Sequence, residues 1–177
     1  MSDNHGETSA NQSDTQEDVS KSKGARRLIL IAVDGSDHSE RAFKFYLENI
    51  KEDGDQLKFI HVIEPVYTAP AFGVVMDLPQ LPDMAQIMRR SAHDGEVLLK
   101  HFMQVAKEHG VKTEGLVLVD SNPGSAVVQM VEKLKANMII LGNRGVGIIR
   151  RTFLGSVSDY VLHHSHVPVV IVPPPSS

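Results

Sequence analysis

The chain has 177 residues, a formal net charge of −4 and no cysteine. Its length suffices for one domain with a hydrophobic core, and the lack of cysteine excludes disulfides, thiolate metal sites and thiol catalysis. The small net charge does not indicate nucleic acid or a membrane surface as a partner, and no run approaches the roughly 18 apolar residues that a membrane span requires. Because the N-terminus also lacks the apolar stretch of a secretory signal, we expect a cytoplasmic protein.

The first 24 residues differ in composition from the rest of the chain. They are rich in Ser, Asn, Asp, Glu and Gln, and five acidic residues against two lysines give a net charge of −3. Such a segment cannot bury enough apolar surface to offset the entropy of ordering. We therefore predict a disordered acidic tail over residues 1–24, a folded domain over residues 25–174 and a short C-terminal tail over residues 175–177.

Strand-like and helix-like segments alternate after this tail. Leu28–Val33 is a continuous apolar run, which is typical of a strand that is buried on both faces. A capping box from Asp37 to Glu40 predicts the start of a helix, and apolar residues at helical spacing continue it to Ile50. Leu57–Ile63 is the second predicted strand.

The alternation continues after a segment over residues 64–83, which contains four prolines and one glycine and is predicted to be a long loop. The remaining predicted elements are a helix over about Met84–His109 ended by Gly110, a strand over Gly115–Val119, a helix with Pro123 in its first turn, a strand over Met138–Leu141, a helix over about Ser156–His164 and a strand over Val167–Val172. This order predicts an α/β fold with an open parallel sheet and helices on both faces.

The last predicted strand contains Pro168, which lacks an N–H group and therefore belongs at a sheet edge. The rest of the strand is strongly apolar, and a bare apolar edge promotes aggregation unless something covers it. We therefore expect a homodimer that pairs through residues 167–172. Sedimentation as a monomer at micromolar concentration would count against this expectation.

A spaced glycine motif follows the fourth strand: Gly142, two residues, Gly145, nine residues, and then Gly155-Ser156. Glycines after a strand let the backbone approach a ligand closely. A helix N-terminus with free N–H groups and a serine hydroxyl binds anions. The motif therefore predicts a phosphate site, with a purely structural turn as the alternative.

Two further segments should meet this motif, because the carboxyl ends of parallel strands converge at one edge of a sheet. They are Asp34-Gly35-Ser36 after the first strand, which could also be a simple capped turn, and Val62 near the end of the second strand. The first turn does not carry the Rossmann fingerprint, the chain has no P-loop motif, and the glycine pair of the ATP pyrophosphatase loop is missing.

Some charged residues allow two interpretations. Arg144, Arg150 and Arg151 could contact phosphate or could be solvated surface residues. His163, His164 and His166 have the composition of a metal cluster, but cations also suit the C-terminal end of a helix, which is the interpretation we favour.

With Val33-Asp34-Gly35-Ser36, the complete glycine motif and the closing segment His163–Val169, residues 26–173 resemble the universal stress proteins, in particular their ATP-binding branch. The resemblance implies a single-domain, three-layer, adenine-nucleotide alpha-hydrolase-like fold with strand order 3-2-1-4-5 and a dimer built on the fifth strand. It implies ATP or AMP as the ligand and allows a magnesium ion on the phosphates. The implied contacts are Ala32, Val33, Asp34, Ser36 and Val62 near adenine and ribose, Gly142, Asn143, Arg144, Gly145, Val146 and Gly147 around ribose and the α- and β-phosphates, and Gly155, Ser156, Val157 and Ser158 at the β- and γ-phosphates.

Three functions fit this sequence. The first is a dimeric stress-response regulator that changes its surface on binding adenine nucleotide. The second is a slow ATPase or autophosphorylating enzyme; since we find no dedicated base beside the phosphates, we expect turnover far below the roughly 1–100 per second of kinases. The third is a dimeric scaffold without nucleotide. We further expect larger residues at Gly142, Gly145 or Gly155 to abolish binding while leaving the fold largely intact.

Overall fold

The computed structural model describes residues 26–65, 84–143 and 154–175. The acidic tail, most of the 64–83 segment and residues 144–153 of the glycine motif lie outside this part. The described elements are, in chain order, β1 (Leu28–Ala32), α1 (Asp37–Phe45), the short π-helix η1 (Tyr46–Ile50), β2 (Gln56–Ile63), α2 (Met84–Glu108), β3 (Lys112–Val119), α3 (Pro123–Leu134), β4 (Met138–Gly142), α4 (Ser156–His164) and β5 (Val169–Val172). None of the described helices is long and apolar enough to cross a membrane.

The five strands form one sheet in the order β3-β2-β1-β4-β5, which confirms the predicted topology. All neighbouring strands are parallel. The chain moves outward from β1 to β3 and then returns to the other side of β1 to form β4. The strand order therefore reverses between β1 and β4, and ligands of such sheets bind beyond the carboxyl ends of the strands at this point.

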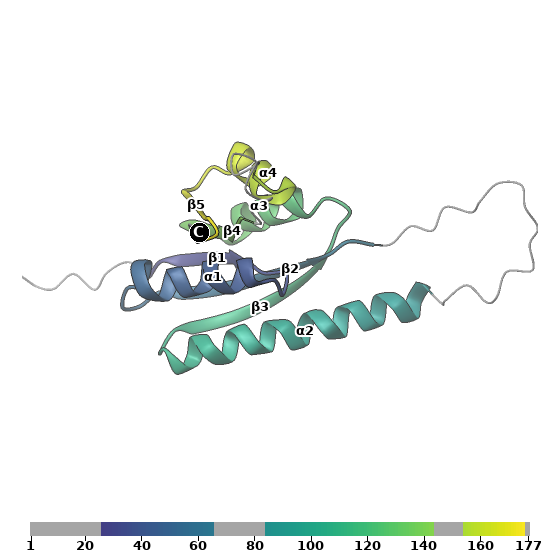
Figure 1. The fold of residues 1–177 in the computed structure, drawn as a ribbon, viewed down its shortest axis with the longest axis horizontal. Helices are drawn as coiled ribbons and strands as arrows, with labels where there is room; N and C mark the ends of the chain where they lie inside the picture. Colours follow the sequence, from purple (N-terminus) through teal and green to yellow (C-terminus); the bar gives the residue numbers. More distant parts are fainter. Residues whose placement is uncertain (1–25, 66–83, 144–153, 176–177) are drawn as a thin grey trace, which may run out of the picture.

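Helices cover both faces of the sheet. Successive side chains of a strand point to opposite faces, so the apolar strands need a covering layer on each side. Figure 1 shows α2 on one side of the strands and α3 and α4 on the other. One core cluster lies on the α1 and α2 side and includes Ile29, Ile31, Phe43, Phe59 and Phe102. The second lies on the α3 and α4 side and includes Leu30, Ile60, Val127, Ile139 and Val161. The burial of β1 on both faces is thereby confirmed.

Several predicted element ends are wrong by a few residues. The helix α1 begins at Asp37, but its N-cap is Ser36, so the capping box from Asp37 to Glu40 is not formed as predicted. The strand β3 begins at Lys112 instead of Gly115, since edge position lets it continue through polar residues. The strand β5 begins at Val169; the carbonyl of Pro168 still accepts a hydrogen bond from the N–H of Ile139 at 3.0 Å.

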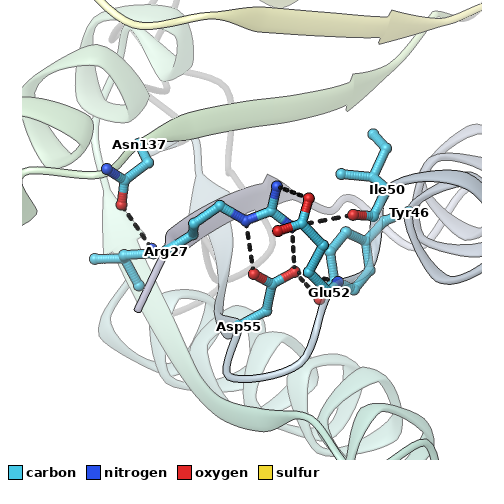
Figure 2. Close-up of polar contacts among 7 residues, drawn as sticks. Arg27, Tyr46, Ile50, Glu52, Asp55 and Asn137 are labelled. Atoms are coloured by element: carbon cyan, nitrogen blue, oxygen red, sulfur yellow. Dashed lines mark hydrogen bonds and ion pairs between the residues drawn. The ribbon is translucent and has the colours of Figure 1, made fainter. Parts of the chain in front are cut away.

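A hydrogen-bonded network closes the amino end of the sheet (Figure 2). The Asp55 carboxylate accepts hydrogen bonds from Nε and Nη2 of Arg27, each at 2.8 Å, from the Tyr46 hydroxyl at 3.0 Å and from the Glu52 N–H at 2.9 Å. Arg27 also donates to the Glu52 carboxylate at 2.8 Å and to the Ile50 carbonyl at 3.0 Å. The network therefore joins the start of β1 to the end of η1 and the start of β2.

The network also shifts the pKa values of two of its own side chains, Asp55 and Tyr46. Burial would raise the pKa of Asp55, but the hydrogen bonds from Arg27, Glu52 and Tyr46 together lower that pKa below its usual value. Burial and the neighbouring Asp55 carboxylate raise the pKa of Tyr46. Asp55 is thus held as a buried carboxylate, with a side chain only 2% exposed, because its charge is paired and hydrogen-bonded.

Candidate functional site

A cavity of about 270 Å³ opens at the carboxyl ends of β1, β2 and β4, where the strand order reverses. Many of the residues predicted from the sequence line it: Ala32, Val33, Asp34, Ser36, Val62, Gly142, Gly155, Ser156, Val157 and Ser158. The structure thus brings together segments from both ends of the chain. The volume of the cavity is close to the lower end, about 300 Å³, of the range for typical ligand pockets.

The other predicted site residues divide into two groups. Asn143 is buried but does not line the cavity; its N–H donates to the Val172 carbonyl at 2.9 Å, and its carbonyl accepts from Arg41 Nη2 at 3.0 Å. The remaining four lie outside the described residues: Arg144, Gly145, Val146 and Gly147.

The sequence reasoning missed seven lining residues: His38, Ser39, Ile60, Glu64, Pro123, Val127 and Leu141. One signal could have found two of them. Ile60 and Glu64 are each two positions from Val62 and therefore face the same side of β2 and its extension. Leu141 enters the site through its place on β4, and His38, Ser39, Pro123 and Val127 enter it through the packing of α1 and α3 against the sheet.

The turn after β1 is held by its own side chains. One carboxylate oxygen of Asp34 accepts hydrogen bonds from the Ser36 N–H at 3.1 Å and from the Ser36 hydroxyl at 2.5 Å. Gly35 between them has a φ of +74°, a conformation that glycine adopts without steric cost. The turn presents the exposed Asp34 at the cavity, where a carboxylate can accept hydrogen bonds from hydroxyl or amino groups.

Two helices begin at the cavity without a capping hydrogen bond from a side chain, α1 after Ser36 and α4 after Gly155. In each, a buried serine donates back to the N-cap carbonyl: Ser39 to Ser36 at 2.9 Å and Ser158 to Gly155 at 3.0 Å. The first N–H groups of a helix have no partner within the helix, and the helix dipole is positive there. The arrangement therefore suits an anion at the cavity.

One part of the cavity lining is apolar. It consists of Ala32, Ile60, Val62, Val127 and Leu141, and the buried members of this set belong to the core on the α3 and α4 side. A cavity with one apolar wall and one wall of helix N-termini can hold a ligand that has a flat apolar ring and a charged group.

The two motif glycines in the described part have different roles. A Cβ at Gly142 would lie 2.1 Å from the carbonyl oxygen of His38 and 2.5 Å from its carbonyl carbon. The end of β4 therefore lies against the backbone of α1, and a larger residue at Gly142 would require one of the two segments to shift. Among the described residues, a Cβ at Gly155 would meet nothing closer than the Ser158 hydroxyl at 3.6 Å. Gly155 is thus free of this steric demand.

The histidines near the end of α4 make helix-end contacts. The Nδ1 atoms of His163 and His164 donate to the carbonyls of Asp159 and Tyr160, each at 2.8 Å. His166 Nε2 lies 3.7 Å from a carboxylate oxygen of Glu132. Across residues 26–65, 84–143 and 154–175, no three His, Cys, Asp or Glu side chains are grouped to hold a metal ion.

Comparison with known proteins gives consistent matches. The sequence model of the universal stress protein family matches residues 25–173. A universal stress protein of Methanocaldococcus jannaschii is 32% identical over 149 residues, which are 84% of this chain and 83% of the relative.

Two solved structures share the fold. A universal stress protein of Arabidopsis thaliana with AMP bound has a TM-score of 0.59 and 21% identity, over 85% of this chain and 93% of that protein. A universal stress protein of Archaeoglobus fulgidus in complex with dAMP has a TM-score of 0.53 and 22% identity, over 82% of this chain and 97% of that protein. At these identities the likeness establishes the fold, which is of the adenine-nucleotide alpha-hydrolase-like type.

Proposed function

The chain belongs to the universal stress protein family. We propose that it is a cytoplasmic, dimeric regulator of a stress response. We further propose that it binds ATP or AMP in the cavity at the carboxyl ends of β1 and β4. The observation that carries the proposal is the convergence of two helix N-termini without side-chain caps, α1 and α4, on a cavity with an apolar wall. The AMP and dAMP complexes of proteins with this fold support the choice of an adenine nucleotide.

Each wall of the cavity suits one part of the nucleotide. The N-terminus of α4, with Gly155 and Ser156, binds the phosphates through backbone N–H groups and a hydroxyl. The apolar wall receives the adenine, and Asp34 accepts hydrogen bonds from the adenosine part because a carboxylate repels phosphate. The resemblance also implies phosphate contacts from residues 144–147, which lie outside the described residues. A magnesium ion would bind to the phosphate oxygens, as this hard cation prefers oxygen ligands.

The proposed dimer uses β5, which lies at the edge of the sheet. Its residues Val169, Val170 and Ile171 are apolar and only half-buried in the single chain. A second copy would cover this edge and remove an aggregation hazard. Sedimentation at micromolar concentration tests this part, and a monomer in the presence and absence of ATP would contradict it.

Calorimetric titration with ATP and AMP, with and without magnesium, tests the proposed ligand. We expect micromolar binding by the wild-type protein and at least tenfold weaker ATP binding by Gly155→Ala, because the added methyl group lies where the phosphates approach the helix backbone. The variant should remain as stable as the wild type, since the new Cβ clashes with nothing in the described structure. Ser121→Ala, at an exposed serine outside the cavity, is the matched control and should bind normally.

The same samples separate binding from catalysis. A hydrolysis rate below about one turnover per minute would agree with a binding role, since kinases work at about 1–100 per second. Faster hydrolysis would favour the enzyme alternative. If the wild-type protein binds neither nucleotide, the proposal is wrong and a scaffold role takes its place.

A further inference from the structure

His61 lies close to the candidate site, but its side chain is on the opposite face of β2 from the residues that line the cavity. It is on β2 between Ile60 and Val62, which line the cavity, so its side chain points to the α2 side. There its Nδ1–H donates a hydrogen bond to the carbonyl oxygen of Val33 at 2.9 Å. The carbonyl determines the tautomer, because it can only accept.

This hydrogen bond fixes the backbone one residue beyond the end of β1. The strand ends at Ala32, and the N–H of Val33 still donates to the Ile60 carbonyl at 2.8 Å. The Val33 carbonyl, in contrast, receives its donor from the His61 side chain. The two peptide groups on either side of the Val33 Cα are thus each held by one hydrogen bond immediately before the turn that lines the cavity.

The helix α2 holds His61 in this position. Gly95 lies in the interior of α2, where a glycine lowers helix stability relative to alanine. A Cβ at Gly95 would lie 2.7 Å from Cδ2 and 3.4 Å from Nε2 of His61. The glycine therefore provides the space that the imidazole occupies.

The next turn of α2 reaches the same segment directly. A Cβ at Gly35 would lie 3.5 Å from Cδ1 of Leu98, so this leucine packs behind the turn that carries Asp34 and Ser36. Through Gly95 and Leu98, α2 contacts both His61 and the turn. A change in the position of α2 would change the support of the turn from two directions.

We propose that His61 is a positioning residue that couples the packing of α2 on the sheet to nucleotide affinity in the cavity at the carboxyl ends of the strands. The inference rests on the proposed function. Because coupling between two sites is reciprocal, nucleotide binding stabilises the contact of α2 with His61, and a partner that moves α2 changes the affinity for nucleotide. The regulated element is the turn of Asp34, Gly35 and Ser36.

Two substitutions separate positioning from simple packing. His61→Leu keeps an apolar body of similar size and removes the donor. His61→Asn places an amide N–H group near the position of Nδ1 and can restore the hydrogen bond to Val33. If His61 only fills space, Leu should replace it at least as well as Asn.

The first measurement needs no ligand. Hydrogen exchange of the amides of residues 34–36 should be faster in His61→Leu than in the wild type and should return toward the wild-type rate in His61→Asn. The second measurement is ATP affinity, which should fall about tenfold in His61→Leu and recover in His61→Asn. Equal behaviour of the two variants, or an unchanged exchange rate in His61→Leu, would overturn the proposal.

Gly95→Ala tests the link to α2 with His61 in place. It should accelerate exchange of the turn and weaken ATP binding in the same direction as His61→Leu, because the new methyl group displaces the imidazole. Glu96→Ala, on the exposed side of the same helix, is the control and should change neither. If Gly95→Ala leaves both unchanged, α2 is not coupled to the site. Failure of the wild-type protein to bind ATP would contradict the proposed function, while the exchange rates would still decide the role of His61.

Discussion

At the amino end of the sheet the buried carboxylate of Asp55 accepts four hydrogen bonds from Arg27, Tyr46 and Glu52, whereas at the carboxyl end the helices α1 and α4 begin without a capping side chain. Both ends collect polar groups beside buried strands. At one end the protein supplies every partner of the buried charge, and at the other it leaves helix N-termini facing a cavity.

The difference separates stability from binding. Breaking a buried charge pair costs more than the pair contributes, because the remaining charge loses its partner. Unpaired groups at a binding site contribute little to stability without the ligand. When the ligand binds, it stabilises the folded protein by an amount that grows with the logarithm of the ligand concentration. We therefore expect substitutions at the amino end to change folding and substitutions at the carboxyl end to change affinity.

The largest effect is expected for Asp55→Asn. This change leaves the Arg27 guanidinium without its buried counter-charge, and we expect a loss of about 3–5 kcal/mol in the free energy of unfolding. Urea denaturation measures it. Glu52→Gln, at the exposed carboxylate bonded to the same arginine, should cost under about 1 kcal/mol. Comparable losses in the two variants would show that burial does not distinguish the two carboxylates.

The same network predicts how stability depends on pH. The pKa of Asp55 is lower in the folded protein than the value of about 3.9 in an unfolded chain. Its contribution is therefore fully present above that unfolded value and is lost as the pH falls through the folded pKa. Denaturation midpoints measured between pH 6 and pH 2 should fall more steeply in the wild type than in Asp55→Asn. Parallel curves would contradict the assignment of this acid sensitivity to Asp55.

Two of the three motif glycines, Gly142 and Gly155, give a smaller and sharper test. We expect Gly142→Ala to reduce stability by about 1–3 kcal/mol, because its Cβ would overlap the backbone of His38 and the chain must shift. Gly155→Ala should leave the denaturation midpoint unchanged while it weakens ATP binding. Thermal unfolding without ligand, followed by titration of each variant, separates the two roles. Equal stability of the two variants would show that the close contact at Gly142 carries no cost.

Local sequence patterns predicted the strands and their order of appearance because apolar runs such as Leu28–Val33 carry the signal within a few residues. The prediction of a capping box at Asp37 was wrong for a local reason as well. The N-cap of α1 is Ser36, and the Ser36 hydroxyl donates to Asp34. The strand order itself came from the resemblance and is confirmed by the structure.

The site was predictable only in part. Asp34, Ser36 and Gly155 stand in short motifs with a known chemistry, and they line the cavity. Val127 and Leu141 carry no mark other than their apolar character, which most core residues share. Val127 reaches the cavity only because α3 packs on the sheet, and Leu141 only because β4 pairs with β1. The contact between Gly142 and His38 likewise depends on two segments far apart in the chain. Such information is tertiary and is absent from any single motif.

The contact between Gly142 and the backbone of α1 also affects how such motifs should be interpreted in evolution. A descendant of this chain that stopped using nucleotides would still be under selection to retain a glycine at position 142, since the helix would otherwise be displaced. None of the described residues would exert such a pressure at position 155, and substitutions there would then accumulate by drift. A glycine at position 142 therefore indicates only that the fold is retained. A glycine at position 155 is the better indicator that the proposed nucleotide binding is retained.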